Sequence, residues 1–163
     1  MVAQIALRPL GIWTIVALAL MAAGCGSGSG PTFKVTPVKG KVTMGGQPLA
    51  NAQVSLMRQG QPPEGYPGSG GKTDAQGNFE VMTGAQKGVP AGKYTVVVSK
   101  IVGADNKPLV DDPNNTTTDK GMLMAEGKVK DLVPPSHNDA GQSQTIVEVT
   151  DGKPVPDVTI AIP

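Results

Sequence analysis

Histidine and cysteine are nearly missing from this 163-residue chain, which contains one of each, His137 and Cys25. A zinc site normally takes three or four ligands from histidine, cysteine and carboxylate side chains. His137 has no second histidine with which to share a metal ion, so we interpret it as a structural loop residue. It follows Ser136, but no Gly-x-Ser-x-Gly motif accompanies the pair, and a serine hydrolase is therefore not expected.

Aromatic residues are also scarce, at 3% of the chain. This scarcity predicts a thin core of aliphatic side chains and modest stability, with Phe33, Phe79 and Tyr94 as its rings. Carbohydrate sites usually stack sugars on exposed rings. Tyr66, in a Gly/Pro-rich loop, is the one ring that we expect to be exposed and available to a glycan.

The chain has no large excess of one charge, since its 14 basic residues are nearly balanced by 13 acidic residues. The sequence has no basic stripe that could neutralise phosphates, so no nucleic-acid partner is expected. Polybasic attraction to anionic lipid is equally unsupported. No small-molecule substrate and no cofactor is indicated by any motif.

Long hydrophobic runs are absent, and the longest, residues 10–23, has 14 residues. A membrane-spanning helix needs roughly 20 apolar residues. The run follows Arg8 and ends in Ala22-Ala23-Gly24-Cys25, which is typical of a bacterial lipoprotein signal peptide. We therefore predict that residues 1–24 are cleaved off and that the Cys25 sulfur carries a lipid with palmitate-type acyl chains.

The alternative is ordinary secretory cleavage near Ala23, which would leave Cys25 as a free thiol. A lone reactive thiol is a liability in an oxidising compartment, so lipidation is favoured. Residues 25–35 then form the lipidated cysteine and a flexible tether, since 26–31 read Gly-Ser-Gly-Ser-Gly-Pro.

What the rest of the sequence contains is a series of short alternating apolar and polar stretches, which predict strands. They cover residues 38–44, 52–56, 79–81, 92–99, 145–149 and 158–162. Gly45 and Gly46 supply the positive φ angles of a tight turn, so the first two stretches are expected to form a hairpin. Residues 59–71 have no periodicity and are expected to form a loop.

Six or seven short strands with frequent Gly and Pro turns predict an all-β fold. We expect a single antiparallel β-sandwich of about seven strands over residues 36–163. Residues 103–132 interrupt this pattern as a loop insertion, with room for a short helix or strand near 122–124.

Several motifs in this pattern resemble the carboxypeptidase regulatory-like domain, whose fold is a transthyretin-like (prealbumin-like) β-sandwich. They are Gly40-Lys-Val42, Gly46-Gln-Pro48, Ala52-Gln-Val54, Thr73-Asp-Ala-Gln-Gly-Asn-Phe79 and Gly92-Lys-Tyr-Thr-Val-Val-Val98. The resemblance covers residues 36–100 and, more loosely, 133–162. Together with the lipoprotein signal motif Ala22-Ala23-Gly24-Cys25 (the lipobox), the arrangement is similar to small surface lipoproteins of planctomycete bacteria.

This resemblance implies a structural, binding or accessory role at the cell surface, since such domains are not enzymes by themselves. Two enzyme types with related sandwiches can be excluded by counting. Intradiol dioxygenases hold iron with two histidines and two tyrosines, and hydroxyisourate hydrolases use several histidines, whereas this chain has one.

Two segments could bind calcium, which prefers carboxylate and carbonyl oxygens. Asp111 and Asp112 belong to a polar cluster without fixed ligand spacing. Asp74 has fewer carboxylates around it and is better interpreted as a turn residue, whose side chain bonds the backbone two residues on.

The leading hypothesis is a non-catalytic, lipid-anchored protein of the bacterial cell envelope that acts as a structural or protein-interaction module. Its envelope partner is not identified by the sequence. The alternative is a surface module that binds calcium or a glycan through Asp111, Asp112 or Tyr66. Gly26, directly after the anchor cysteine, is not an acidic retention signal, so the outer membrane is favoured.

Overall fold

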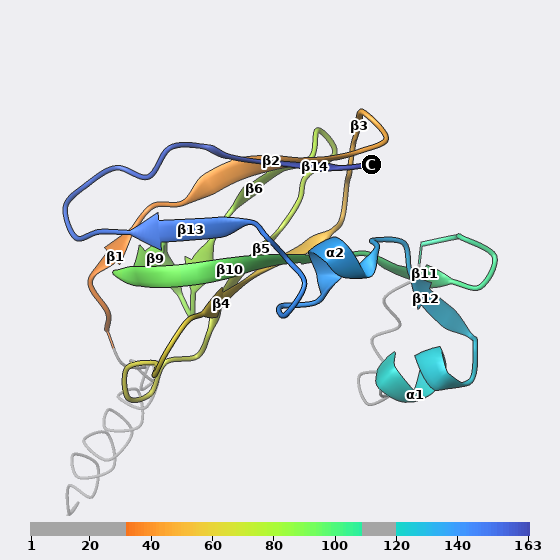
Figure 1. The fold of residues 1–163 in the computed structure, drawn as a ribbon, viewed down its shortest axis with the longest axis horizontal. Helices are drawn as coiled ribbons and strands as arrows, with labels where there is room; N and C mark the ends of the chain where they lie inside the picture. The colour runs from red at the N-terminus through yellow and green to blue at the C-terminus, as the bar shows by residue number, and fades with distance from the viewer. Residues whose placement is uncertain (1–31, 109–119) are drawn as a thin grey trace, which may run out of the picture.

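Strands make up most of the regular structure in the computed structural model, which describes residues 32–108 and 120–163 (Figure 1). The larger sheet has six strands. In spatial order they are β13 (Ile146–Val149), β10 (Gly92–Ser99), β4 (Gln53–Arg58), β5 (Ser69–Lys72), β7 (Met82–Thr83) and β8 (Gln86–Lys87). All neighbours in this sheet are antiparallel.

The second sheet has four strands around β2. They are β14 (Val158–Ile162), β2 (Lys39–Met44), β3 (Gln47–Pro48) and β6 (Asn78–Glu80). β3 and β6 are antiparallel to β2, whereas the C-terminal strand β14 lies parallel to it. The pairing is thus antiparallel throughout the two sheets with this one exception.

Two further strand pairs extend the domain at opposite ends (Figure 1). β1 (Val35–Thr36) pairs with β9 (Val89–Pro90) where the described chain begins. At the other end, β11 (Ile101–Gly103) and β12 (Val129–Asp131) form a ribbon that carries the short helix α1 (Lys120–Ala125). A second short helix, α2 (Pro135–Asn138), contacts β10.

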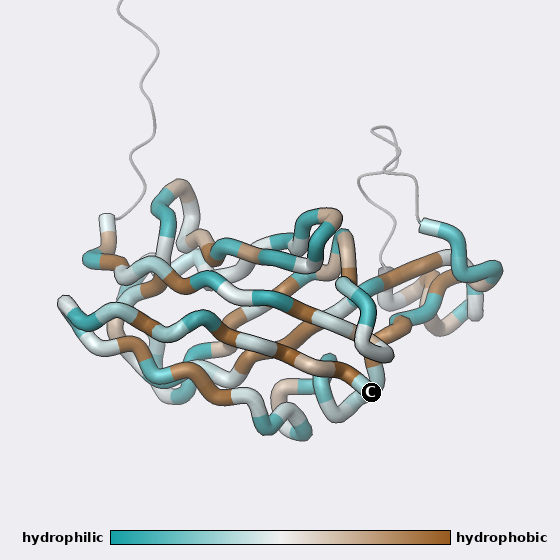
Figure 2. Tube along the Cα trace, turned by 90° about the horizontal axis from the view of Figure 1, so that it is seen from above, coloured by the Kyte–Doolittle hydropathy of each residue, from teal (hydrophilic) through white to brown (hydrophobic). Residues whose placement is uncertain are grey.

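The buried core combines inward-facing side chains from both sheets. Apolar residues recur at every second position of the strands, as the alternating colours along the tube indicate (Figure 2). The core members are mostly aliphatic, and they include Val42, Val54, Leu56, Phe79, Val81, Tyr94, Val96, Val98, Val147, Ile160 and Ile162. Phe79 and Tyr94 are buried as expected, but Phe33 is not a core ring, because it is only half-buried and packs on Tyr66 instead.

Gly40 is a position in β2 at which the neighbouring strands leave no room for a side chain. It pairs with Phe79 of β6 on one side and with Val158 of β14 on the other. A Cβ atom at this position would lie 2.1 Å from the Val158 carbonyl oxygen and 2.7 Å from the Phe79 ring. The missing side chain therefore lets the ring cover β2 and lets β14 come close.

The all-β prediction is confirmed, with two short helices of six and four residues beside the strands described. The predicted hairpin of 38–44 with 52–56 is wrong. The glycine turn at Gly45 and Gly46, with φ of 57° and 77°, leads into the two-residue strand β3, and β4 crosses to the other sheet. The expected loop 59–71 is also too long, because Ser69–Lys72 forms β5 between β4 and β7.

Candidate functional site

The chain enters the described domain at Thr32, and the next residues are fastened to it by several contacts. The backbone N–H of Phe33 donates to Gln86 Oε1 at 2.8 Å, and Gln86 Nε2 donates back to the Phe33 carbonyl at 2.9 Å. The side-chain amide of Gln86, in β8, thus forms the two backbone hydrogen bonds that a neighbouring strand would otherwise form with Phe33. Directly afterwards, β1 pairs with β9. The position of the chain where the described domain begins is therefore set by defined contacts.

Tyr66 lies beside this entry point and is not the exposed ring that the sequence predicts. It is half-buried, packs against the core, and meets the Phe33 ring edge-on with a centroid distance of 6.0 Å. Its hydroxyl lies 2.6 Å from Ser69 Oγ, which lies 2.6 Å from Thr83 Oγ1. Thr83 Oγ1 in turn donates to the Gly88 carbonyl at 2.7 Å. The hydroxyl is engaged in the fold, and this geometry does not favour a sugar platform.

Tyr94 lies fully buried near Tyr66, and its hydroxyl donates to the Pro90 carbonyl at 2.8 Å. Arg58 Nη1 donates to both the Tyr94 hydroxyl and the Ala91 carbonyl, each at 2.8 Å, while its guanidinium carbon lies 5.5 Å from the ring centroid. Burial raises the pKa of the Tyr94 phenol to about 12, although the Arg58 charge acts in the opposite direction. This group therefore stays protonated and serves as a hydrogen-bond donor.

Arg58 and Gln86 are two residues of this site that were not predicted from the sequence. Arg58 had a signal, since it follows Val54 and Leu56 at the inward positions of one strand, where a charge requires a partner. Gln86 had none, because its role depends on the approach of Phe33, which lies 53 residues earlier in the chain.

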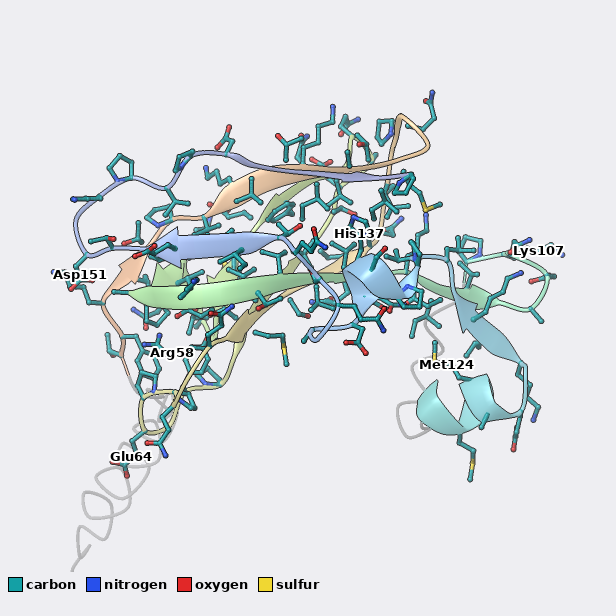
Figure 3. The ribbon with its side chains drawn as sticks, viewed as in Figure 1. Arg58, Glu64, Lys107, Met124, His137 and Asp151 are labelled. Carbon is teal, nitrogen blue, oxygen red and sulfur yellow. The ribbon has the colours of Figure 1, made fainter. Side chains whose placement is uncertain are left out.

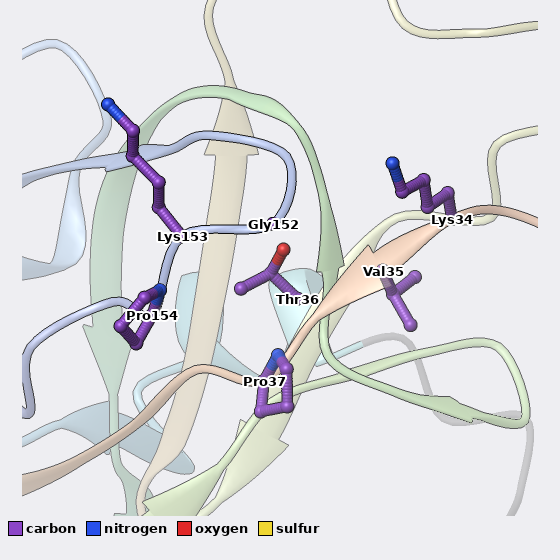
Figure 4. A pocket seen from close by; sticks show the side chains of 7 residues that line it. All are labelled: Lys34, Val35, Thr36, Pro37, Gly152, Lys153 and Pro154. Carbon is purple, nitrogen blue, oxygen red and sulfur yellow. The ribbon is translucent and has the colours of Figure 1, made fainter.

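A shallow groove of about 310 Å³ lies next to the entry segment (Figure 4). One wall is formed by residues 34–37 and the other by Gly152, Lys153 and Pro154. Lys34 Nζ lies 3.3 Å from Asp151 Oδ2, so one of its two lysines is already paired. The lining offers two exposed cations and apolar ring surfaces, and it contains no nucleophile–base pair.

His137 belongs to the short helix α2, so the prediction that it is a loop residue is wrong. Asp151 lies at the far end of the domain (Figure 3). Ser136 Oγ and His137 Nδ1 are 2.9 Å apart, so the two neighbours do contact each other. No carboxylate contact orients the imidazole in the part of the chain that the structure describes. The pair thus lacks the third group that would orient a catalytic base.

Asp74 forms the turn that the sequence predicts. Its Oδ1 accepts the backbone N–H groups of Gln76 and Asn78 at 2.9 and 2.8 Å, and its Oδ2 accepts the Asn78 side-chain amide at 3.1 Å. The bond from the Asn78 side chain is the main reason why the pKa of Asp74 is lowered. Both carboxylate oxygens are therefore occupied by the turn.

The other predicted site residues, Cys25, Asp111 and Asp112, lie outside the described residues. Across residues 32–108 and 120–163, no three His, Cys, Asp or Glu side chains come together in a way that could hold a metal ion. In the same ranges, no helix combines the length and apolar character required to cross a bilayer.

None of the protein-family models, curated proteins or solved structures with which the chain was compared matches it. The resemblance to the carboxypeptidase regulatory-like domain therefore stays a prediction from the residues that carry it.

Proposed function

We propose that this protein is a lipid-anchored, non-catalytic module of a bacterial cell envelope, exported and attached through Cys25. The observation that carries the proposal is the order of segments in the chain. A 14-residue apolar run ends in Ala22-Ala23-Gly24-Cys25, a Gly/Ser tether follows, and the tether leads to a β domain. Two or three acyl chains on one cysteine anchor a protein stably, whereas a single chain binds only marginally.

The geometry of the entry point supports this proposal. The reciprocal bonds between Phe33 and Gln86 and the β1–β9 pair fasten the chain just after the tether. The ribbon of β11 and β12 lies at the other end of the domain (Figure 1). An anchored domain would therefore present this ribbon away from its attachment point, where it is accessible to a protein partner in the envelope.

The finer fold belongs to the same proposal. We infer that the six-stranded and four-stranded sheets pack as a transthyretin-like β-sandwich, with residues 103–132 as an insertion in it. Support comes from the shared core, to which β4 and β10 of one sheet and β2 and β14 of the other contribute. The outer membrane is the favoured location, because Gly26 is not an acidic retention signal.

The alternative function, binding of calcium or a glycan, gains no support from the described contacts. The Tyr66 hydroxyl is engaged by Ser69, whereas the calcium candidates Asp111 and Asp112 lie outside the described residues. The lipid-anchored module is therefore the function that the residues support best.

Metabolic labelling with an alkyne analogue of palmitate tests the anchor. We expect label on the wild-type protein and none on the Cys25→Ser variant. A matched control places a cysteine two residues later, in the double variant Cys25→Ser with Ser27→Cys. It should also remain unlabelled, because processing depends on the position of the cysteine after Ala22-Ala23-Gly24. Label that persists in Cys25→Ser would refute the anchor.

A further inference from the structure

β13 is the last strand of the six-stranded sheet and pairs only with β10 among the described residues. The N–H of Val96 donates to the Thr145 carbonyl at 2.8 Å, and the register continues with Tyr94 opposite Val147. In an antiparallel ladder, bonded and non-bonded positions alternate. The backbone groups of Ile146 and Glu148 therefore point away from β10, towards the open edge.

Every second side chain along this edge is exposed. Ile146 is 50% exposed, whereas Val147 and Val149 are buried in the core. Glu148 and the preceding Gln144 are also exposed. Ile146 lies opposite Thr95, which lies opposite Met57, itself 50% exposed, so two large apolar side chains share one row on the outer face of the sheet.

Natural edge strands are often very short, or they carry a charged side chain (most often lysine), a proline or a bulge that prevents pairing with another chain. At the opposite edge, β8 has two residues and contains Lys87. β14 ends the other sheet, and its exposed side chains are the small Thr159 and Ala161. β13, with the sequence Ile-Val-Glu-Val, has four residues and one charged side chain, Glu148, but no lysine or proline, and it exposes the largest apolar side chain of these three edges.

We propose that β13 pairs with β13 of a second copy of this chain, antiparallel about a two-fold axis at Ile146. This register is self-complementary, because each Ile146 faces the other and Glu148 faces Gln144 of the other copy. An axis at Glu148 would oppose two carboxylates, and an axis at Val147 would place Ile146 opposite Glu148. A two-fold contact uses the same patch on both subunits, so the register must satisfy itself in this way.

The contact is small, and its strength depends on concentration. Stable interfaces bury about 1,200–2,000 Å² in total, more than one pair of short strands provides. We therefore expect weak association in solution that becomes detectable only at high protein concentration. If the proposed lipid anchor exists, confinement to a membrane raises the effective concentration and favours the pair. Only this gain in strength rests on the proposed function.

Disulfide crosslinking of the full chain tests both the partner and the register. In the proposed register, the two Cα atoms at position 146 lie about 5.5 Å apart, within reach of a disulfide. The two at position 148 lie about 14 Å apart, because they are offset by four residues along neighbouring strands. Under mild oxidation we expect Ile146→Cys to yield at least tenfold more homodimer than Glu148→Cys, both in isolated envelopes and in the concentrated purified protein.

Edge-blocking variants give the second readout, in the Ile146→Cys background. Glu148→Pro removes the outward N–H without touching the bonds to β10, and it should abolish the crosslink. Glu148→Ala removes the same side chain but keeps the N–H, so its crosslink should persist. Circular dichroism verifies that both variants fold. If Glu148→Pro does not fold, the proposal is tested by the comparison of crosslinking at positions 146 and 148 alone.

Three results would overturn the proposal: equal crosslinking at the two positions, a crosslink that survives Glu148→Pro in a folded protein, or a product with the mass of a different envelope protein. The wild-type chain distinguishes failure of the proposed lipid anchor from failure of the proposed β13 pairing. Its only cysteine is Cys25, so a homodimer of the oxidised wild type would reveal a free, unlipidated thiol.

Discussion

At the scale of single residues, Tyr94 is a titratable group that is buried, hydrogen-bonded and adjacent to the charged Arg58 side chain. Its ring is buried, its hydroxyl donates to Pro90, and Arg58 donates to that hydroxyl. Removing the phenol proton would place a negative charge among core side chains and would cost the bond to Pro90. Burial accordingly raises the pKa of Tyr94 to about 12, despite the nearby guanidinium.

A single-tyrosine variant makes this pKa measurable. The chain has two tyrosines, so Tyr66→Phe leaves Tyr94 as the only phenol. We expect the folded variant to ionise with a midpoint well above the ordinary value of about 10, read as tyrosinate absorbance at 295 nm. Loss of the Tyr66 hydroxyl removes the second-largest cause of the raised pKa, whereas burial, the largest cause, remains. In concentrated urea the midpoint should return to about 10.

The same pKa links ionisation to stability. A raised pKa means that the folded state holds its proton more tightly, so the stabilising contribution is complete below pH 10 and is lost between pH 10 and 12. Tyr94→Phe should remove this step from the dependence of the urea midpoint on pH. A folded Tyr66→Phe protein that titrates near pH 10 would contradict the buried hydroxyl.

At the scale of secondary-structure elements, the packing of β2 between β6 and β14 depends on Gly40. A methyl group there would meet both the Phe79 ring and the Val158 carbonyl. We expect Gly40→Ala to lower the free energy of unfolding by about 2–3 kcal/mol, since overpacking a filled core typically costs 1–3 kcal/mol. Urea denaturation followed by far-ultraviolet circular dichroism measures this loss.

Gly45→Ala is the matched control, because a Cβ atom at Gly45 meets nothing within 4 Å and the only strain comes from its φ of 57°. Its cost should be about 1–2 kcal/mol. If Gly40→Ala proved as stable as the wild type, β14 would not approach β2 as closely as the structure has it.

Strand positions were predictable from the sequence, whereas strand partners were not. Alternation predicted β2, β4, β10, β13 and β14, because burial of one face imposes a period of two. The partner of β4 is set by the packing of the two sheets, which no local pattern records. β5 had no signal at all. Its Gly70 and Gly71 let the Val54 and Glu80 carbonyls approach, so neighbouring strands rather than alternation specify it.

The candidate site shows the same limit. The burial of Tyr94 followed from its strand pattern, and the turn at Asp74 followed from its local sequence. The engagement of Tyr66 did not, because its partner Ser69 lies in the strand that the sequence failed to indicate. Because β5 was not predicted, the Tyr66 ring was wrongly expected to be exposed.

At the scale of the whole molecule, three surface carboxylates favour their charged forms. Contact with Lys87 is the main cause of the lowered pKa of Glu80, and the Lys107 backbone N–H is the main cause for Asp105. The Asn78 side chain does the same for Asp74. Because each pKa is lower in the folded state, each group stabilises the fold above its unfolded pKa of about 4 and loses that contribution as the pH falls.

We therefore expect the urea midpoint to be nearly constant from about pH 5 to pH 8 and to fall below about pH 4. Asp74→Asn should lower the midpoint at pH 7, because a neutral amide accepts the turn bonds less strongly than a carboxylate. Its difference from the wild type should shrink towards pH 2.5, where the wild-type carboxyl is itself neutral. Glu64→Gln, on an exposed loop without an ion pair among the described residues, should follow the wild type throughout (Figure 3). A difference for Asp74→Asn that stays equal at pH 7 and pH 2.5 would show that the carboxylate charge is not what stabilises the turn.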